Sequence, residues 1–184
     1  MKKIFSKLFL KVMGWKLVGE VPKEVKKAVL VCAPHTSNWD FPIALASFVL
    51  ADLKVKYFIK KSWFFFPMNI FFKATGGIPV DRSKNHGLVD SITQLLKESD
   101  EMIIAVPPEG TRSWVLKWKT GFYHIAKSAK VPIIMGFVDF KMKEVGFGPM
   151  FNISGDFEKD MSKIQAFFEN KSGKYPNKYN PNIF

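Results

Sequence analysis

The segment Pro34-His35-Thr36-Ser37-Asn38-Trp39-Asp40 follows directly after an apolar run at residues 28–33, a pattern typical of a buried strand and the loop that leaves it. His35 and Asp40 are five positions apart, and residues with that spacing lie about 140° apart around a helix. Their side chains can therefore meet only if His35 precedes a helix and Asp40 lies in its first turn, where Pro42 is also tolerated.

The histidine and the carboxylate of this segment have two interpretations. In the first, Asp40 holds one ring nitrogen of His35, which is the usual arrangement of a general base. In the second, His35 is an ordinary loop residue and Asp40 lies at the start of the helix without touching it. The segment alone does not separate the two. Ser37 is expected to cap the turn that follows.

Strand-like and helix-like segments alternate along the chain. Apolar runs predict strands at residues 28–33, 55–59, 102–106 and 133–138, with a weaker strand at 146–153. Helical spacing of apolar residues predicts helices at 41–50, 88–97, 122–129 and around 161–168. We therefore expect an α/β fold, in which one domain has a mixed, largely parallel sheet flanked by helices. An irregular tail is expected from Gly173.

Residues 1–18 are predicted to form a basic amphipathic helix, followed by the functional domain at residues 19–184. We expect this helix to lie in a membrane interface, with packing against the core as the alternative. The helix would place its apolar residues on one side and its lysines on the other: Ile4, Phe5, Leu8, Phe9, Val12 and Trp15 against Lys3, Lys7 and Lys11. The same lysines interrupt any secretory signal sequence, so we expect the cytoplasmic face of the membrane.

A second apolar segment lies at residues 63–72 and is rich in phenylalanine. It is too short to span a bilayer, which requires about 20 apolar residues. One interpretation is an unusually aromatic core helix. The other is an apolar groove or a face that dips into a membrane, because Lys60, Lys61 and Lys73 flank the segment.

Basic residues outnumber acidic residues by 28 to 16, and the net charge of +12 favours anionic partners. Only Arg82 and Arg112 are arginines, whereas sequence-specific readers of nucleic acid depend on arginine forks, so no nucleic-acid partner is predicted. An anionic membrane surface suits the many lysines and aromatics better. The single cysteine, Cys32, excludes an intrachain disulfide and reads as a buried strand residue, with a Cys–His nucleophile as the less favoured alternative. No zinc-type ligand spacing is present, so no metal is predicted.

Three polar loops follow apolar runs, and ligand sites of α/β sheets gather at the carboxyl ends of strands. These loops are residues 35–40, Asp81-Arg82 and residues 109–112, and they hold both arginines of the chain. Arginine supplies a rigid fork for bidentate binding of phosphate, which lysine cannot reproduce. The loops therefore indicate a base beside an anion-binding site.

The same residues resemble the glycerophospholipid acyltransferases, a family that shares an H-x4-D motif. The stretch from His35 to Asp40 matches the first family motif, and Gly77-Ile-Pro-Val-Asp-Arg82 resembles the second. Pro108-Glu-Gly-Thr-Arg112-Ser113 matches the third closely, and Val131-Pro132-Ile133-Ile134 resembles the fourth, although the second proline common there is replaced by Met135-Gly136. An H-x4-D motif alone is weak, but with E-G-T-R-S at this distance it is specific. The motifs occur in the family's order over residues 28–138.

The resemblance implies transfer of a fatty acyl group from an acyl-CoA or acyl-carrier-protein thioester to a hydroxyl. The acceptor would be glycerol 3-phosphate, lysophosphatidate or a related lysolipid. His35 would be the general base and Asp40 would orient it, with backbone N–H groups near Gly110 or in the His35 loop as candidates to stabilise the oxyanion. The residues that would bind the acceptor are Arg82, Glu109, Gly110, Thr111 and Arg112. Lys60 and Lys61 are added to this set because they lie at the end of another predicted strand.

No bound cofactor is predicted, since the thioester is a co-substrate. The resemblance and the charge together predict a peripheral protein on an anionic membrane surface. Two alternatives remain open at this stage. One is a hydrolase or transacylase, in which water or a second lipid replaces the usual acceptor. The other is a non-enzymatic basic module that binds a membrane or nucleic acid.

Overall fold

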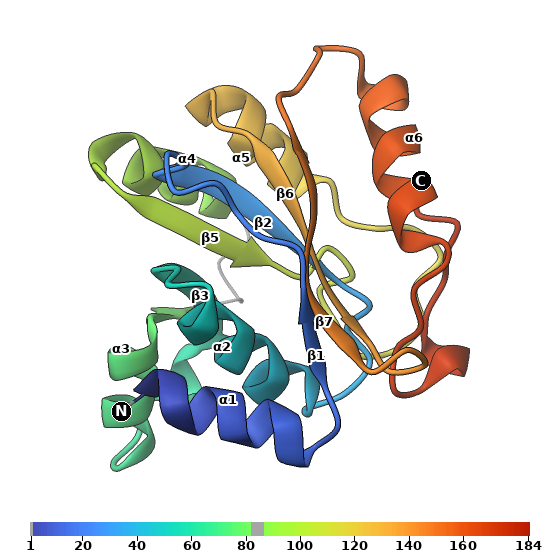
Figure 1. Ribbon diagram of the computed structural model, residues 1–184. Helices are drawn as coiled ribbons and strands as arrows, with labels where there is room; N and C mark the ends of the chain where they lie inside the picture. The colour runs from blue at the N-terminus through green and yellow to red at the C-terminus, as the bar shows by residue number, and fades with distance from the viewer. Residues whose placement is uncertain (1, 82–86) are drawn as a thin grey trace.

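A computed structural model describes residues 2–81 and 87–184, which form one seven-stranded sheet with helices on both faces (Figure 1). The strands are β1 (Lys16–Val18), β2 (Lys27–Ala33), β3 (Val55–Lys60), β4 (Gly77–Val80), β5 (Met102–Val106), β6 (Ile133–Asp139) and β7 (Glu144–Phe151). The α-helices are α1 (Lys2–Val12), α2 (Asp40–Leu50), α3 (Met68–Thr75), α4 (Leu88–Glu98), α5 (Gly121–Ala129) and α6 (Phe157–Phe168). Two short 3₁₀ helices are η1 (Lys61–Trp63) and η2 (Pro176–Lys178).

The strands are ordered β1-β7-β6-β2-β5-β3-β4 across the sheet. Only β6 and β7 pair antiparallel, and every other neighbouring pair is parallel. The predicted α/β fold with a mixed, largely parallel sheet is therefore confirmed. The central strand β2 lies between β6 and β5, so the loop that leaves β2 stands at the middle of the sheet's carboxyl edge.

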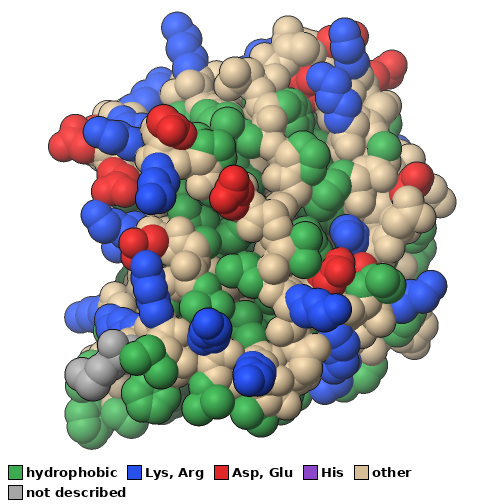
Figure 2. Space-filling view, viewed as in Figure 1, with side chains coloured by type: hydrophobic (Ala, Val, Ile, Leu, Met, Phe, Trp, Pro, Cys, Tyr) green, Lys and Arg blue, Asp and Glu red, His purple; other side chains and the backbone are tan. Residues whose placement is uncertain are grey.

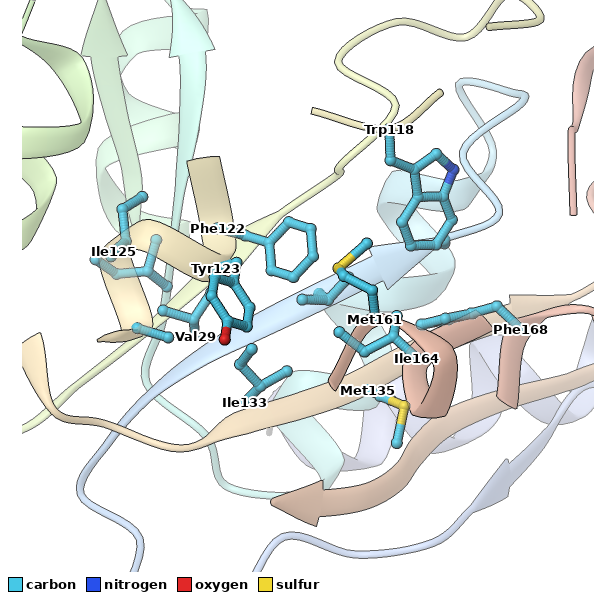
Figure 3. Close-up of a cluster of buried hydrophobic side chains, with 14 of the residues drawn as sticks. Val29, Trp118, Phe122, Tyr123, Ile125, Ile133, Met135, Met161, Ile164 and Phe168 are labelled. Atoms are coloured by element: carbon cyan, nitrogen blue, oxygen red, sulfur yellow. The ribbon is translucent and has the colours of Figure 1, made fainter. Parts of the chain in front are cut away.

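The apolar run that predicted β2 is buried on both faces of the sheet, as expected for a central parallel strand. Val29 and Val31 face a core cluster built with α4, α5 and α6, part of which is drawn in Figure 3. Leu30 faces the opposite side, where it packs in a second cluster with Phe48 of α2. Both faces of β2 are thus closed to water, and the strand's end is a rigid support for the following loop.

The N-terminal helix is shorter than the predicted 1–18. Helix α1 ends at Val12, where Gly14 has φ +74° and Trp15 N–H donates to the Leu10 carbonyl, a glycine-based C-terminal cap. The next residues, Lys16–Val18, pair with β7 as an edge strand. A three-residue strand has too little periodicity to be seen in the sequence, which is why the prediction extended the helix.

The apolar segment at residues 63–72 divides between core and surface. Phe72 is buried and contacts Phe41 of α2, whereas Phe65, Phe66 and Ile70 are exposed. Neither interpretation of the segment is therefore complete. The exposed part of η1 and α3 lies on the same side of the sheet as α1 and α2 (Figure 1).

The edge strand β4 contains Pro79, a residue that departs from the second family motif. Strand β4 has a single neighbour, β3, and proline is tolerated on an edge strand because the missing N–H has no ladder partner to lose. The motif therefore keeps its place at the carboxyl edge of the sheet. The last residue of that motif, Arg82, lies outside the described residues.

Candidate active site

Two loops meet at the carboxyl edge of the sheet because their strands are neighbours. His35 follows β2 and Glu109 follows β5, and these strands pair in parallel with Val31 opposite Val106. The two residues are 74 positions apart in the chain, yet the backbone N–H of His35 donates to Glu109 Oε1 and Oε2 at 3.1 and 3.0 Å. The parallel register thus joins the first and third sequence motifs into one site.

The side chains of His35 and Asp40 are in contact, as the first interpretation of the segment predicts. The distance from His35 Nδ1 to Asp40 Oδ2 is 3.1 Å, and the His35 side chain is 22% exposed. An ionised carboxylate only accepts hydrogen bonds, so Nδ1 carries the proton and donates it to Asp40. The other ring nitrogen, Nε2, then has a free lone pair, which is the form of histidine that removes a proton from a substrate.

Asp40 also holds the loop that carries the histidine. Its Oδ2 accepts the backbone N–H groups of Thr36 and Ser37, each at 2.9 Å, in addition to His35 Nδ1. Asp40 is the first residue of α2 and is 5% exposed. Ser37 Oγ accepts the backbone N–H of Trp39 within the turn that precedes α2. The N-cap residue of α2 is Trp39, which has no side-chain cap, so Ser37 does not cap the helix.

Glu109 is buried beneath the loop that carries His35. The residue is 3% exposed, and both of its oxygens accept the His35 N–H. Burial raises the pKa of the Glu109 carboxyl to about 7, partly opposed by the His35 N–H bond and reinforced by the charge of Asp40. The carboxyl is thus engaged with the protein backbone, and it holds the loop that carries His35.

The raised pKa of Glu109 predicts a pH-dependent stability. Folded Glu109 holds its proton up to about pH 7, whereas the unfolded residue releases it near 4.5, so the folded state binds more protons between these values. The contribution of Glu109 to the free energy of unfolding is therefore full below pH 4.5 and falls by about 3 kcal/mol as the pH rises to 7. Urea unfolding of wild type and Glu109→Gln at pH 4.5 and 7.5 measures this change.

Glutamine at position 109 can still accept the His35 N–H but does not titrate, so the variant should gain stability relative to wild type as the pH rises. Glu20→Gln, at an exposed loop position, is the control. A stability difference between wild type and Glu109→Gln that is the same at both pH values would contradict the assigned pKa shift.

The predicted site residues that the structure describes follow strands β5 and β3 at the same edge of the sheet. Gly110 has φ +68°, a conformation that favours glycine, and a Cβ there would lie 3.1 Å from the Lys119 side chain. Thr111 and Arg112 are exposed on the same loop. Lys60 ends β3, the neighbour of β5, and Lys61 begins η1, and both are exposed. The binding roles of these residues stay predictions.

Several expected details change once the contacts are known. The N–H groups of His35, Thr36 and Ser37 all donate to carboxylates, and the Gly110 N–H donates to the Pro107 carbonyl, so these four are not available to an oxyanion. Burial raises the pKa of the Cys32 thiol to about 12, which rules out a thiolate nucleophile. Within residues 2–81 and 87–184, no three His, Cys, Asp or Glu side chains cluster as a metal site requires.

The C-terminal tail is a part of the site that the sequence interpretation missed. The Tyr175 N–H donates to Thr36 Oγ1 at 3.3 Å, across 139 positions of sequence. A Cβ at Gly173 would lie 2.5 Å from the same oxygen, so only glycine permits this approach. Tyr179 is buried, and the charge of Glu109 adds to burial in raising the pKa of its hydroxyl. The sequence signal for this packing was the presence of apolar residues such as Ile183 in an otherwise polar tail. Ile183 is fully buried, and a segment that buries such a side chain must pack against the domain.

Known proteins are similar to this chain in sequence and in fold. A family model described as Acyltransferase matches residues 16–135. The 1-acyl-sn-glycerol-3-phosphate acyltransferase of Haemophilus influenzae is 31% identical over 140 residues, covering 71% of this chain and 56% of that protein. The enzyme of that name from Saccharomyces cerevisiae is 30% identical over 133 residues, covering 65% of this chain and 41% of that protein. The chain thus spans about half the length of these relatives.

A solved structure is similar over most of the chain. The 1-acyl-sn-glycerophosphate (LPA) acyltransferase of Thermotoga maritima superimposes with a TM-score of 0.63 at 19% identity, covering 90% of this chain and 74% of that one. At this identity the similarity concerns the fold alone. The matched fold includes the sheet whose carboxyl edge carries His35, Asp40 and Glu109.

Proposed function

Because the chain belongs to the acyltransferase family, we propose that it transfers an acyl group from a thioester to the hydroxyl of a 1-acylglycerol 3-phosphate or a related lysolipid. The observation that carries the proposal is the contact between His35 Nδ1 and Asp40 Oδ2, which leaves Nε2 as a base at the mouth of the site. The names of the two curated relatives favour this acceptor.

The residues can perform the transfer in two steps. In the first, His35 Nε2 takes the proton of the acceptor hydroxyl while the oxygen attacks the thioester carbonyl and forms a tetrahedral intermediate. In the second, the carbon–sulfur bond breaks and the imidazolium returns the proton to the departing thiolate. Asp40 stabilises the imidazolium between the steps and holds the ring orientation. No covalent acyl-enzyme is needed, because the hydroxyl itself is the nucleophile.

Recognition of the acceptor is assigned to the loops after β5, β3 and β4. Arg112, Lys60 and Lys61 are exposed at this side of His35, where their charges can pair with a phosphate. Arg82 is assigned to the same phosphate from its place in the second motif. An acceptor whose phosphate pairs with these side chains would bind with its hydroxyl toward His35.

An acceptor screen tests the proposed function directly. The purified protein is incubated with acyl-CoA or acyl carrier protein thioesters and with glycerol 3-phosphate, lysophosphatidate or lysolipids that lack a phosphate. Thiol release is followed and the product is identified by mass spectrometry. We expect acceptor-dependent release and an acylated phospholipid. Release of equal size without any acceptor would contradict the proposal and indicate a hydrolase.

We also propose that the protein binds a membrane through α1. Four apolar side chains on this helix are exposed to solvent: Ile4 at 71%, Phe5 at 70%, Leu8 at 56% and Val12 at 75%. Lys3, Lys7 and Lys11 lie on the same helix, and Figure 2 shows hydrophobic side chains and lysines together along the edge formed by α1. An exposed apolar stripe with flanking lysines suits an anionic bilayer surface. No described helix is both long and apolar enough to cross a bilayer.

Replacing Phe5 and Leu8 with glutamine is expected to lower binding to anionic vesicles by at least about tenfold, because burying either side chain contributes roughly 1.5–3 kcal/mol. Deleting the helix is a poorer test, since Leu10 is buried and its loss would open the core. Vesicle co-sedimentation measures the effect.

The double variant Met142→Gln/Met150→Gln, which changes two exposed apolar side chains elsewhere, is the control. The assignment would be contradicted if the variant Phe65→Gln/Ile70→Gln no longer bound vesicles while the α1 variant bound them as wild type does. The membrane contact would then be the 63–72 segment.

A further inference from the structure

Four side chains lie together beside the loop that carries His35, and we call them the aromatic–lysine cluster: Trp39, Lys174, Tyr175 and Lys178. Lys174 Nζ lies 5.3 Å from the centre of the Trp39 ring and 5.8 Å from that of Tyr175, and Lys178 Nζ lies 4.8 Å from the Tyr175 ring. Trp39 is 45% exposed and Tyr175 is 44% exposed. The cluster thus presents alternating aromatic faces and positive charges to solvent.

The charges of the cluster are not neutralised by the protein. In the part of the chain that the structure describes, no acidic side chain forms an ion pair with Lys174 or Lys178. Both lysines are exposed, and their ammonium groups lie over the rings. A cluster built this way has both a stacking surface and free cations.

The cluster is held against the catalytic loop. The Ser172 carbonyl accepts the N–H of Phe140, directly after β6, and Gly173 packs on Thr36. The Tyr175 N–H bonds Thr36 Oγ1, and Thr36 is the neighbour of His35. Residues 172–175 therefore cross from the end of β6 to the end of β2 (Figure 1). Trp39 itself lies between His35 and Asp40 in the sequence.

The strand order separates two sides of the base. The loops assigned to the acceptor follow β5, β3 and β4, which lie to one side of β2, whereas the cluster crosses the end of β6 on the other side. Transfer requires the acceptor hydroxyl and the thioester to approach His35 together. With the acceptor on the β5 side, the thioester enters from the side of β6, where the cluster lies.

From this placement, and resting on the proposed function, we infer that the aromatic–lysine cluster binds the phosphorylated nucleotide of a coenzyme A thioester. An adenine ring can stack on the exposed Tyr175 or Trp39, as bases stack on aromatic side chains in general. Its phosphates can pair with the free ammonium groups of Lys174 and Lys178. A carrier protein would present a broad acidic surface without a ring to stack, which leaves the aromatic half of the cluster unused.

Direct binding tests this inference without any turnover. Titration calorimetry measures the Kd of coenzyme A and of adenosine 3′,5′-bisphosphate for the full chain, without lipid or detergent. The variant Lys174→Gln/Lys178→Gln is expected to raise both Kd values by about tenfold, because it removes two charge-assisted contacts. Tyr175→Leu is expected to raise them at least about fivefold by removing stacking. The control Lys127→Gln/Lys159→Gln makes the same charge change on α5 and α6 and should stay within twofold of wild type.

Steady-state kinetics give a second test, because a merely structural role of the cluster would not change KM for one substrate alone. The lysine variant should have a higher KM for acyl-CoA than wild type but an unchanged KM for the acceptor. With an acyl-pantetheine donor, which lacks the nucleotide, the KM values of variant and wild type for the donor should agree within twofold. The inference is overturned if the bisphosphate binds wild type and variant equally, or if the variant instead loses affinity for acyl carrier protein or for anionic vesicles. A wild type that binds the nucleotide but transfers no acyl group would contradict the proposed function and not this inference.

Discussion

Replacing His35 with alanine is expected to lower kcat for acyl transfer by at least about 100-fold, the usual loss when general-base catalysis is removed. The side chain is partly exposed and its ring makes one hydrogen bond, to Asp40, so the variant should still fold. Thiol release with saturating thioester and acceptor measures kcat, and circular dichroism compares the folded states.

The matched control is His124→Ala, which removes an exposed histidine from α5. It should keep the wild-type rate. Turnover by His35→Ala within a few-fold of wild type would overturn the assignment of His35 as the base and with it the proposed mechanism.

Replacing Asp40 should separate two effects that the wild-type residue combines. Asp40→Asn keeps an acceptor for the backbone N–H groups of Thr36 and Ser37 but removes the charge that stabilises the imidazolium. We expect kcat to fall roughly 10²- to 10³-fold with little loss of stability. Asp40→Ala leaves these donors without a partner and should also lower the free energy of unfolding by about 2–4 kcal/mol. Urea unfolding and kcat are measured for both variants.

Asp52→Asn is the control, since Asp52 is exposed, forms its ion pair with Lys3 at the surface, and has a positive φ that asparagine tolerates. The double variant His35→Ala/Asp40→Asn should be no slower than His35→Ala, because Asp40 acts through the histidine. A further 100-fold loss in the double variant would show that Asp40 acts independently and contradict its orienting role.

Parts of the site were predictable from sequence because they depend on short-range geometry. The five-residue spacing of His35 and Asp40, with Pro42 beyond, admitted contact only across a strand-to-helix turn, and α2 does begin at Asp40. The contact itself was one of two interpretations. The short strand β1 was not predictable, because three residues carry no readable periodicity and its pairing with β7 is set by residues far along the chain.

The sequence by itself determined the apolar runs that become buried strands, and hence the α/β class and the placing of polar loops at strand ends. Burial of a run depends on its own composition, so this information is local. Only the tertiary structure decided that β2 neighbours β5 and β6. That order places Glu109 beneath His35 and brings the tail from Gly173 across to Thr36, because contacts 74 and 139 positions apart depend on strand order and packing rather than on spacing along the chain.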